Sequence, residues 1–262
     1  LFRSNSISIK DYKKSILKEQ TSPHNKIAVI YANGNIIDGQ GDYENIGFEI
    51  ADECSAVDIV DLDACLAYAR AHRVDGVMTA ATDYGVLSAS YIAKTMGLPG
   101  LDFETAKIIK NKYLVRDILY SKTGQGISQY FEVNDLDHLP VKRGSIEFPV
   151  IVKPCDGSGS KGVNKAGNFN ELMIAVGTAL NASRIHKALV EKFINGKEFG
   201  VESIVLNGEV HVLGIMGKHM TDPPDYAELG HFMPSRLGME AKVKDIVRRS
   251  IQALGINYGA VN

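Results

Sequence analysis

The sequence has no tryptophan and only three cysteines among its 262 residues. Cys54, Cys65 and Cys155 are an odd number at no metal-ligand spacing, so no zinc site is expected. So few cysteines favour a reduced compartment, and we expect a cytoplasmic protein. The chain also lacks any run of about 18 apolar residues, the length that a membrane-spanning helix requires. A membrane protein is therefore not expected.

The chain has little net charge. It carries 29 Lys and Arg residues against 31 Asp and Glu residues, a formal charge of −2, and the basic residues are scattered. Because nucleic acids and anionic membranes attract clustered positive charge, neither is an expected partner. Hydrophobic residues make up 45% of the chain, an ordinary value for a globular protein, and its length suffices for one large or two modest domains.

From about residue 46, short apolar runs alternate with segments of helical spacing, which predicts an α/β protein with a mainly parallel sheet. Two Asn-Gly pairs, Asn33-Gly34 and Asn207-Gly208, predict hairpins. Strands are predicted at 26–31, 76–81, 128–133, 148–153, 162–168, 188–194, 198–206, 209–216 and 256–261, and helices at 61–73, 88–96, 104–119, 168–180 and 238–254. Asp61 is a predicted N-cap, Asn168 or Asn170 caps the helix at 168–180, and Gly97 is predicted to end the helix at 88–96.

The most informative segment is 148–162, an apolar strand that presents Lys153 and then opens into a glycine-rich loop. Gly157, Gly159 and Gly162 lack a Cβ atom, so the loop backbone can bring its N–H groups against phosphate oxygens. The segment therefore predicts a phosphate-binding loop.

Three known glycine-rich loops fit this segment poorly. In the dinucleotide fingerprint the helix opens immediately after the loop, whereas 162–168 has the pattern of a returning strand. A Walker A loop ends in Gly-Lys-Ser/Thr, but Val163 follows Gly162. A protein-kinase loop precedes its lysine, and the His-Arg-Asp and Asp-Phe-Gly motifs are missing.

Some residues keep two interpretations at this level. On spacing alone, Lys112 is as compatible with a solvated helix face as with a phosphate contact, because it shares its predicted helix with other basic residues. Asp83 is interpreted as a helix N-cap or a turn residue rather than a ligand, with the cap favoured. Cys155 is interpreted as a packing residue, because no histidine is near it in sequence.

Lysine before a glycine loop, followed by Glu191-Lys-Phe-Ile and then Glu198, resembles the ATP-grasp family. The resemblance covers about residues 47–262 and is greatest to the carbamoyl-phosphate-synthase large-chain type, a group of ATP-dependent carboxylate–amine ligases. Supporting motifs occur in the family's order at 50–53, 75–83, 97–100, 111–113 and 228–234.

The resemblance implies an α/β ATP-grasp fold with a curtailed N-terminal Rossmann-like domain. The implied domains are a partial pre-ATP-grasp domain at 47–103, an N-terminal ATP-grasp subdomain with the glycine-rich lid at 104–187, and a truncated C-terminal subdomain at 188–262. Residues 1–46 form an arm and a strand that resemble a segment of signal peptide peptidases of the protease IV type.

The resemblance also implies the roles of individual residues. Lys112 and Lys153 would bind ATP phosphates, with Lys153 also catalytic, and Glu198 would accept the ribose hydroxyls. The lid would be formed by Gly157, Ser158, Gly159, Ser160 and Gly162, the adenine site by Glu191, Lys192, Phe193 and Ile194, and the acceptor site by Glu202, Lys218, Glu228 and His231.

In the reaction that the resemblance implies, a carboxylate attacks the γ-phosphate of ATP and an amine then displaces phosphate from the acyl phosphate. The family uses Mg²⁺, whose ligands follow the strand at 256–261. This chain ends at Asn262, so no metal ligand is assigned and ligation is expected to be poor or absent. The alternatives are a catalytically impaired nucleotide-binding module or a fusion fragment, and, less favoured, a function in the protease-like front. The oligomeric state stays open.

Overall fold

The computed structural model describes residues 27–30, 55, 57–79, 83–126, 128–139, 145–221, 228–235 and 237–262. The chain divides into two compact units, residues 1–100 and 101–262. Most of the arm at 1–46, the Asn33-Gly34 hairpin and the 50–53 motif lie outside the described residues, and no described helix is long and apolar enough to cross a membrane.

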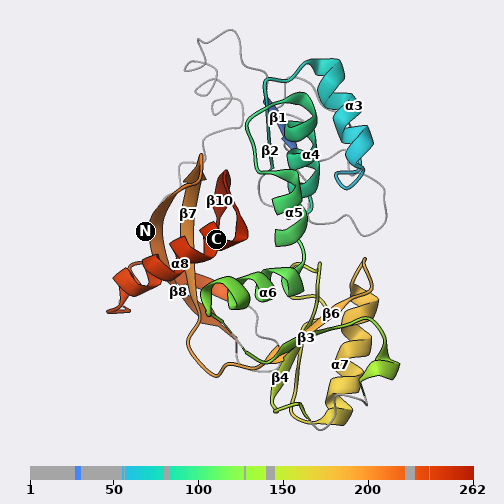
Figure 1. Cartoon of the computed structure of the whole chain (residues 1–262), viewed down its shortest axis with the longest axis vertical. Coiled ribbons are helices and arrows are strands. Elements are labelled where there is room, and N and C mark those ends of the chain that lie inside the picture. Colours follow the sequence, from blue (N-terminus) through green and yellow to red (C-terminus); the bar gives the residue numbers. More distant parts are fainter. Residues whose placement is uncertain are drawn as a thin grey trace, which may run out of the picture. The chain divides into compact units, whose positions relative to one another are not determined.

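Among its described residues, unit 1 contains a parallel strand pair and two helices (Figure 1). The elements are β1 (Ile27–Ile30), α3 (Leu62–His72), β2 (Gly76–Thr79) and α4 (Val86–Met96). Asp61 caps α3 by accepting a hydrogen bond from the Ala64 N–H, and Gly97 ends α4 in the left-handed region, both as predicted. The predicted cap at Asp83 is wrong, because α4 begins after Gly85 and Asp83 lies in the preceding turn.

Unit 2 contains two four-stranded sheets and four α-helices among its described residues (Figure 1). The first sheet has the order β3-β6-β4-β5, with β3 (Tyr130–Val133), β4 (Val150–Pro154), β5 (Asn164–Ala166) and β6 (Ala188–Lys192). The second has the order β10-β7-β8-β9, with β7 (Phe199–Leu206), β8 (Glu209–Met220), β9 (Glu228–Phe232) and β10 (Gly259–Val261). The helices are α5 (Phe103–Ile109), α6 (Lys112–Thr123), α7 (Phe169–Ala182) and α8 (Glu240–Leu254), with a 3₁₀ turn at Leu136–His138.

The expectation of a mainly parallel sheet is wrong for unit 2. Every strand pair of its two sheets is antiparallel, and the only parallel pair described is β1 with β2. Short connections explain the difference, because a two-residue turn at Asn207-Gly208 can join only antiparallel neighbours, whereas parallel strands need a long crossover. The predicted hairpin between β4 and β5 and the Asn168 cap of α7 are confirmed.

The helix predicted at 104–119 is in fact two helices, α5 and α6. Asn111 interrupts it, because its side-chain oxygen accepts hydrogen bonds from the N–H groups of Tyr113 and Leu114 and so caps a new helix. The break makes Lys112 the first residue of α6.

The core of the first sheet lies between β4, β6 and α7. Val150, Val152 and Val190 are fully buried on the face that packs against α7, together with Leu172 and Val176 of that helix. Because side chains alternate along a strand, Ile151 and Lys153 project from the opposite face. Burial of one face thus determines which β4 side chains are available for a site.

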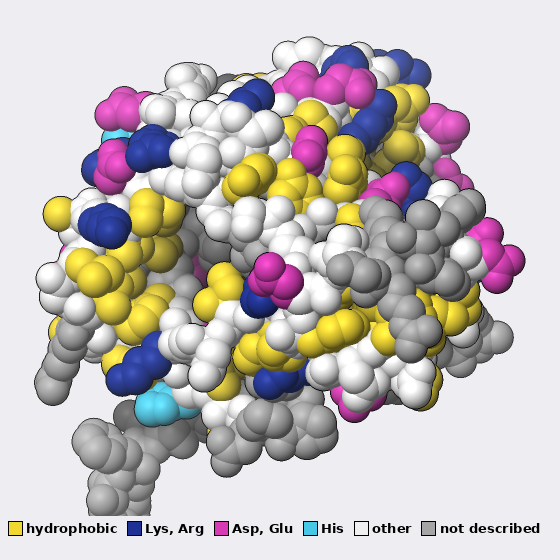
Figure 2. Space-filling model, turned by 60° about the horizontal axis from the view of Figure 1, so that its bottom comes forward, with side chains coloured by type: hydrophobic (Ala, Val, Ile, Leu, Met, Phe, Trp, Pro, Cys, Tyr) yellow, Lys and Arg dark blue, Asp and Glu magenta, His cyan; other side chains and the backbone are white. Residues whose placement is uncertain are grey.

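Charges of both signs are interspersed on the face of the molecule shown in Figure 2. Lys and Arg side chains alternate with Asp and Glu side chains over the described residues of that face. This agrees with the near-neutral net charge of −2.

Candidate functional site

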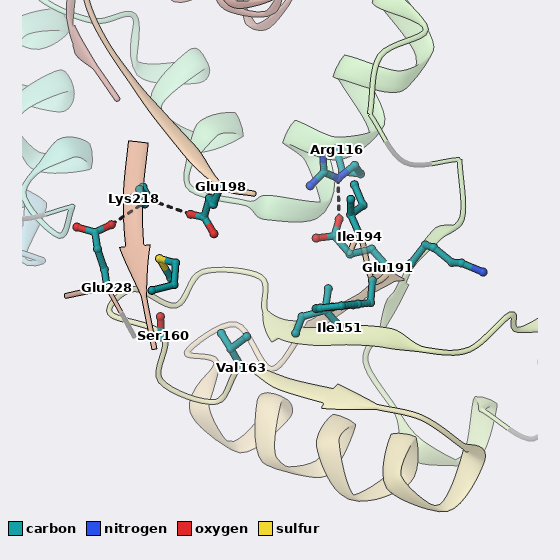
Figure 3. Close-up of a pocket in the computed structure, with 12 residues that line it drawn as sticks. Arg116, Ile151, Ser160, Val163, Glu191, Ile194, Glu198, Lys218 and Glu228 are labelled. Atoms are coloured by element: carbon teal, nitrogen blue, oxygen red, sulfur yellow. Dashed lines mark hydrogen bonds and ion pairs between the residues drawn. The ribbon is translucent and has the colours of Figure 1, made fainter. Parts of the chain in front are cut away.

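Unit 2 contains a cleft of about 590 Å³ (Figure 3). Helix α6, strands β4, β6, β8 and β9, the glycine loop and the segment after β6 contribute to its walls. The lining residues are Arg116, Ile151, Ser160, Val163, Glu191, Lys192, Phe193, Ile194, Glu198, Lys218, Met220 and Glu228.

One wall of the cleft carries a buried carboxylate between two cations. The Arg116 Nε donates to one Glu191 oxygen at 2.7 Å, and the Lys153 ammonium pairs with the other. The Glu191 side chain is only 3% exposed. We call Lys153, Glu191 and Arg116 the buried triad. Two cations against one carboxylate leave it with a net charge of +1, which favours an anion in the cleft.

Strand register explains how the triad forms. Ile151 of β4 lies opposite Glu191 of β6, so the two side chains share a face, and Lys153 follows Ile151 by two residues on that face. Arg116 reaches the same carboxylate from α6. Sequence reasoning missed Arg116, although its position one helical turn after Lys112 is a usable signal.

The glycine loop is fastened at both ends. The Asp156 carboxylate accepts hydrogen bonds from the Ser183 hydroxyl at 2.6 Å and the Arg184 N–H at 3.1 Å, which ties the loop to the end of α7. Gly162 has φ +76°, and a Cβ there would approach Ala182 Cβ to 2.8 Å, so no other residue fits. The predicted loop residue Ser160 lines the cleft.

Lys112 lies against the start of the loop. Its backbone N–H donates to the Cys155 carbonyl at 2.8 Å, and its ammonium donates to the Gly157 carbonyl. The solvated-face interpretation of Lys112 is therefore wrong, because the cap at Asn111 turns the helix start toward the loop. Cys155 is fully buried, and this burial raises its thiol pKa to about 12, as fits a packing residue.

The segment after β6 gives the cleft an apolar strip. Phe193 and Ile194 line it, and Ile194 is 66% exposed. The Lys165 ammonium lies 4.0 Å from the centre of the Phe193 ring, and Lys192 pairs with Glu147 at 2.9 Å. The strip therefore presents apolar surface to the cleft, because the ammonium group of the neighbouring Lys192 is paired with Glu147.

The other wall carries a chain of charges across the second sheet. Lys218 of β8 pairs with Glu198 at 2.9 Å and with Glu228 of β9 at 3.0 Å, and the His231 Nε2 lies 3.2 Å from the second Glu228 oxygen. We call Glu198, Lys218, Glu228 and His231 the cross-strand row. The hydrogen bond to Glu198 is the largest cause that raises the Lys218 pKa, and the hydrogen bond from Lys218 lowers the Glu228 pKa.

The structure brings together some predicted residues and separates others. Glu191, Lys192, Phe193, Ile194, Glu198, Ser160, Lys218 and Glu228 line the cleft, whereas Lys112, Lys153, Gly157, Ser158, Gly159, Gly162, Glu202 and His231 do not. Lys153 and His231 each pair with a lining residue. Glu202 lies where β7 still pairs regularly with β8, but it does not line the cleft.

The cleft does not fit a magnesium site in the part of the chain that the structure describes. Its carboxylates at Glu191, Glu198 and Glu228 each pair with a lysine or arginine. No three His, Cys, Asp or Glu residues gather closely enough to hold a metal ion among the described residues.

Relatives among characterised and uncharacterised proteins are distant. The uncharacterised protein y4rH of Sinorhizobium fredii is 27% identical over 220 residues, which cover 80% of this chain and 45% of that protein. D-alanine–D-alanine ligase of Acetivibrio thermocellus is 31% identical over 143 residues, 55% of this chain and 32% of the ligase. The chain thus spans less than half the length of these two relatives.

The predicted resemblance to carbamoyl-phosphate synthase is supported by a distant relative. A carbamoyl phosphate synthase large chain of Methanospirillum hungatei is 30% identical over 109 residues, 41% of this chain and 10% of that protein. The resemblance of residues 1–46 to signal peptide peptidases is not supported by the comparisons.

A solved structure shares the fold of most of the chain. The L-amino acid ligase of Bacillus licheniformis superposes with a TM-score of 0.73 at 23% identity and covers 90% of this chain and 62% of its own. Residues 146–262 match the family described as the ATP-grasp domain. The predicted ATP-grasp fold is thus confirmed, and residues 146–262 are similar in sequence to the ATP-grasp domain.

Proposed function

We propose that this chain binds ATP in the cleft of unit 2 and belongs to a ligase that joins a carboxylate to an amine through an acyl phosphate. The observation that carries the proposal is the division of the cleft into a cationic end, made by the buried triad beside the glycine loop, and an apolar strip that leads to Glu198. A nucleotide has the same division into an anionic triphosphate, a flat apolar base and a ribose diol.

Each part of ATP has a matching surface in this proposal. The triphosphate lies beside Lys153, Lys112 and the glycine loop, where net positive charge in a partly dehydrated cleft offsets its negative charge. The base lies on the strip at Phe193 and Ile194, and Glu198 accepts hydrogen bonds from the ribose. The first sheet, which includes β6 of the predicted C-terminal subdomain, and the second sheet then contribute the two walls of the cleft.

The buried triad also has a chemical role in the proposal. Glu191 holds the Lys153 ammonium in one place, so its charge is positioned before the phosphoryl group moves. A substrate carboxylate oxygen bonds to the γ-phosphorus while the bond to ADP breaks. The amine nitrogen then bonds to the acyl carbon, phosphate leaves, and the amine loses a proton.

The ligases among the relatives support the reaction class. D-alanine–D-alanine ligase is 31% identical over its matched segment. Its name describes the joining of an amino acid carboxylate to an amine. We therefore propose a small carboxylate and a small amine as the substrates, with each to be identified by assay.

Lys153→Met tests the proposal. ATP should raise the melting temperature of the unaltered chain, because a ligand that binds only the folded state stabilises it. Lys153→Met should weaken ATP binding by about tenfold or more, since it removes a charge at the phosphates. Isothermal titration calorimetry with ATP measures both affinities.

Lys187→Met is the matched control, because Lys187 also pairs with a carboxylate, Glu132 at 2.8 Å, but does not line the cleft. It should bind ATP as the unaltered chain does. Equal loss in both variants, or no loss in either, would contradict the phosphate assignment. ADP release with a panel of amino acids then separates a ligase from a module that only binds nucleotide.

A further inference from the structure

The cross-strand row is an ordered feature of the second sheet. The Lys218 N–H donates to the Glu198 carbonyl at 3.4 Å, and Lys218 lies opposite His231 in the pairing of β8 with β9. Residues directly opposite in an antiparallel pair project from the same face, so Glu198, Lys218 and His231 lie side by side. Glu228 completes the row from the bulged end of β9.

Lys218 is the centre of this row. Its ammonium contacts two carboxylates at once, Glu198 at 2.9 Å and Glu228 at 3.0 Å, and Figure 3 shows both contacts. Its stem passes over Gly200, where an added Cβ would lie 3.5 Å from the Lys218 Cε. The Lys218 side chain is 21% exposed, far less than its partner Glu198 at 56%. The cation is thus the fixed member of the pair.

Exposure argues against a mainly stabilising role for these pairs. Ion pairs between exposed side chains contribute little to folding because water competes for both charges. Lys218 contacts Glu198 through Oε1, and Oε2 has no partner among the described residues. The pair therefore holds the carboxylate through one oxygen and leaves the other oxygen available to a ligand.

We propose that Lys218 is a positioning residue for ribose recognition, which it controls by fixing the Glu198 carboxylate toward the 2′ and 3′ hydroxyls of the nucleotide. This inference rests on the proposed ATP function. A carboxylate free to rotate accepts a diol only after it loses rotamer freedom, whereas a fixed one has already done so. Glu228 holds Lys218 from the other side and so sets the place of both groups.

Lys218 also has a general electrostatic effect, which the experiment must separate from positioning. Its charge offsets that of Glu198, so its loss leaves a carboxylate that repels the triphosphate of any nucleotide. That repulsion acts equally on ATP and on 2′,3′-dideoxy-ATP, which lacks both hydroxyls. The affinity ratio of these two nucleotides therefore reports positioning alone.

The experiment compares both affinities by calorimetry in the full chain. The unaltered chain should prefer ATP over 2′,3′-dideoxy-ATP by about tenfold, the usual worth of hydrogen bonds to a charged group. Lys218→Met should reduce this preference to about threefold or less, Glu198→Gln should do the same, and the double variant should lose no more than either alone. Lys218→Arg should restore most of the preference, and Lys187→Met should leave it unchanged.

The outcomes distinguish this inference from the function on which it rests. If the unaltered chain does not bind ATP at all, the proposed function fails and this inference fails with it. If ATP binds but the preference is absent, or is the same in Lys218→Met as in the unaltered chain, the positioning role alone is overturned. Circular dichroism of each variant checks the fold, and a misfolded Lys218→Met leaves Lys218→Arg and Glu228→Gln to decide, since loss of Glu228 should also lower the ratio.

Discussion

The two walls of the cleft carry charge in opposite ways. In the buried triad, Glu191 is 3% exposed and its two cations, Lys153 and Arg116, are 22% and 23% exposed. In the cross-strand row, Glu198 and Glu228 are 56% and 40% exposed. The cations of the two walls are about equally exposed, with Lys218 at 21%, so the walls differ in their carboxylates: Glu191 is removed from water, whereas Glu198 and Glu228 are left in it.

This difference in exposure indicates which charged residues support the fold and which are available to bind a ligand. A carboxylate taken out of water costs several kcal/mol unless cations replace its hydration, so the triad members depend on one another. Exposed carboxylates keep much of their hydration and depend little on Lys218 for stability. The triad should therefore respond to substitution mainly through folding, and the row mainly through what it binds.

Glu191→Gln should give the largest effect on stability. It leaves two partly buried cations without their counter-charge, which should cost about 3 kcal/mol and lower the melting temperature by roughly 6–12 °C. Differential scanning calorimetry of the full chain measures this change. Glu198→Gln is the matched substitution in the row and should leave the melting temperature nearly unchanged. Similar losses in both variants would remove the distinction between the walls.

Two double-mutant cycles, one in each wall, compare the coupling energies of the ion pairs directly, and the expected effect is smaller than that of Glu191→Gln. Lys153→Met combined with Glu191→Gln should show a coupling energy of about 1–3 kcal/mol, because a partly buried charge that has lost its counter-charge destabilises the folded state. Lys218→Met combined with Glu198→Gln should show about 0.5 kcal/mol or less. Urea unfolding of the unaltered chain, the four single variants and the two double variants provides the values. A larger coupling in the row than in the triad would reverse this interpretation.

Local patterns predicted much of this structure because their physical causes are local. Asn168 caps α7 and Gly97 ends α4 as predicted, since a cap depends on a few neighbouring backbone groups. The strand with Lys153 and the returning strand of the glycine loop were also predictable, because glycine positions and apolar runs mark turns and buried strands. The roles assigned to the site residues stay predictions.

What sequence reasoning missed depends on distant contacts. Arg116 and Glu191 are 75 positions apart, and no local pattern relates them. The direction of the sheets was mispredicted, since alternating strands and helices are compatible with either direction and only pairing decides between them. The break at Asn111 was missed because the capping side chain overrides a helical pattern that continues through it.

The response of the row to pH is the smallest effect and the most specific. The hydrogen bond from Lys218 lowers the Glu228 pKa below its usual 4.5, so the stability from this contact is present above pH 4.5 and is lost as pH falls through the lowered pKa. Lys218 has a pKa raised above 10.5, chiefly by Glu198, so its contribution is present below that pH and is lost as pH rises through the raised pKa. The contacts of Lys218 with Glu198 and Glu228 should thus stay intact from about pH 5 to 10.

Carbon-13 NMR of the Glu228 carboxyl group measures its titration midpoint directly. The midpoint should lie below 4.5 in the unaltered chain and move upward in Lys218→Met, because the largest cause of the lowered pKa has been removed. Lys187→Met should leave the midpoint in place, since Lys187 pairs with Glu132 outside the row. A midpoint that stays the same in Lys218→Met would mean that Lys218 does not hold Glu228. The four residues of the row would then be separate side chains rather than one connected group.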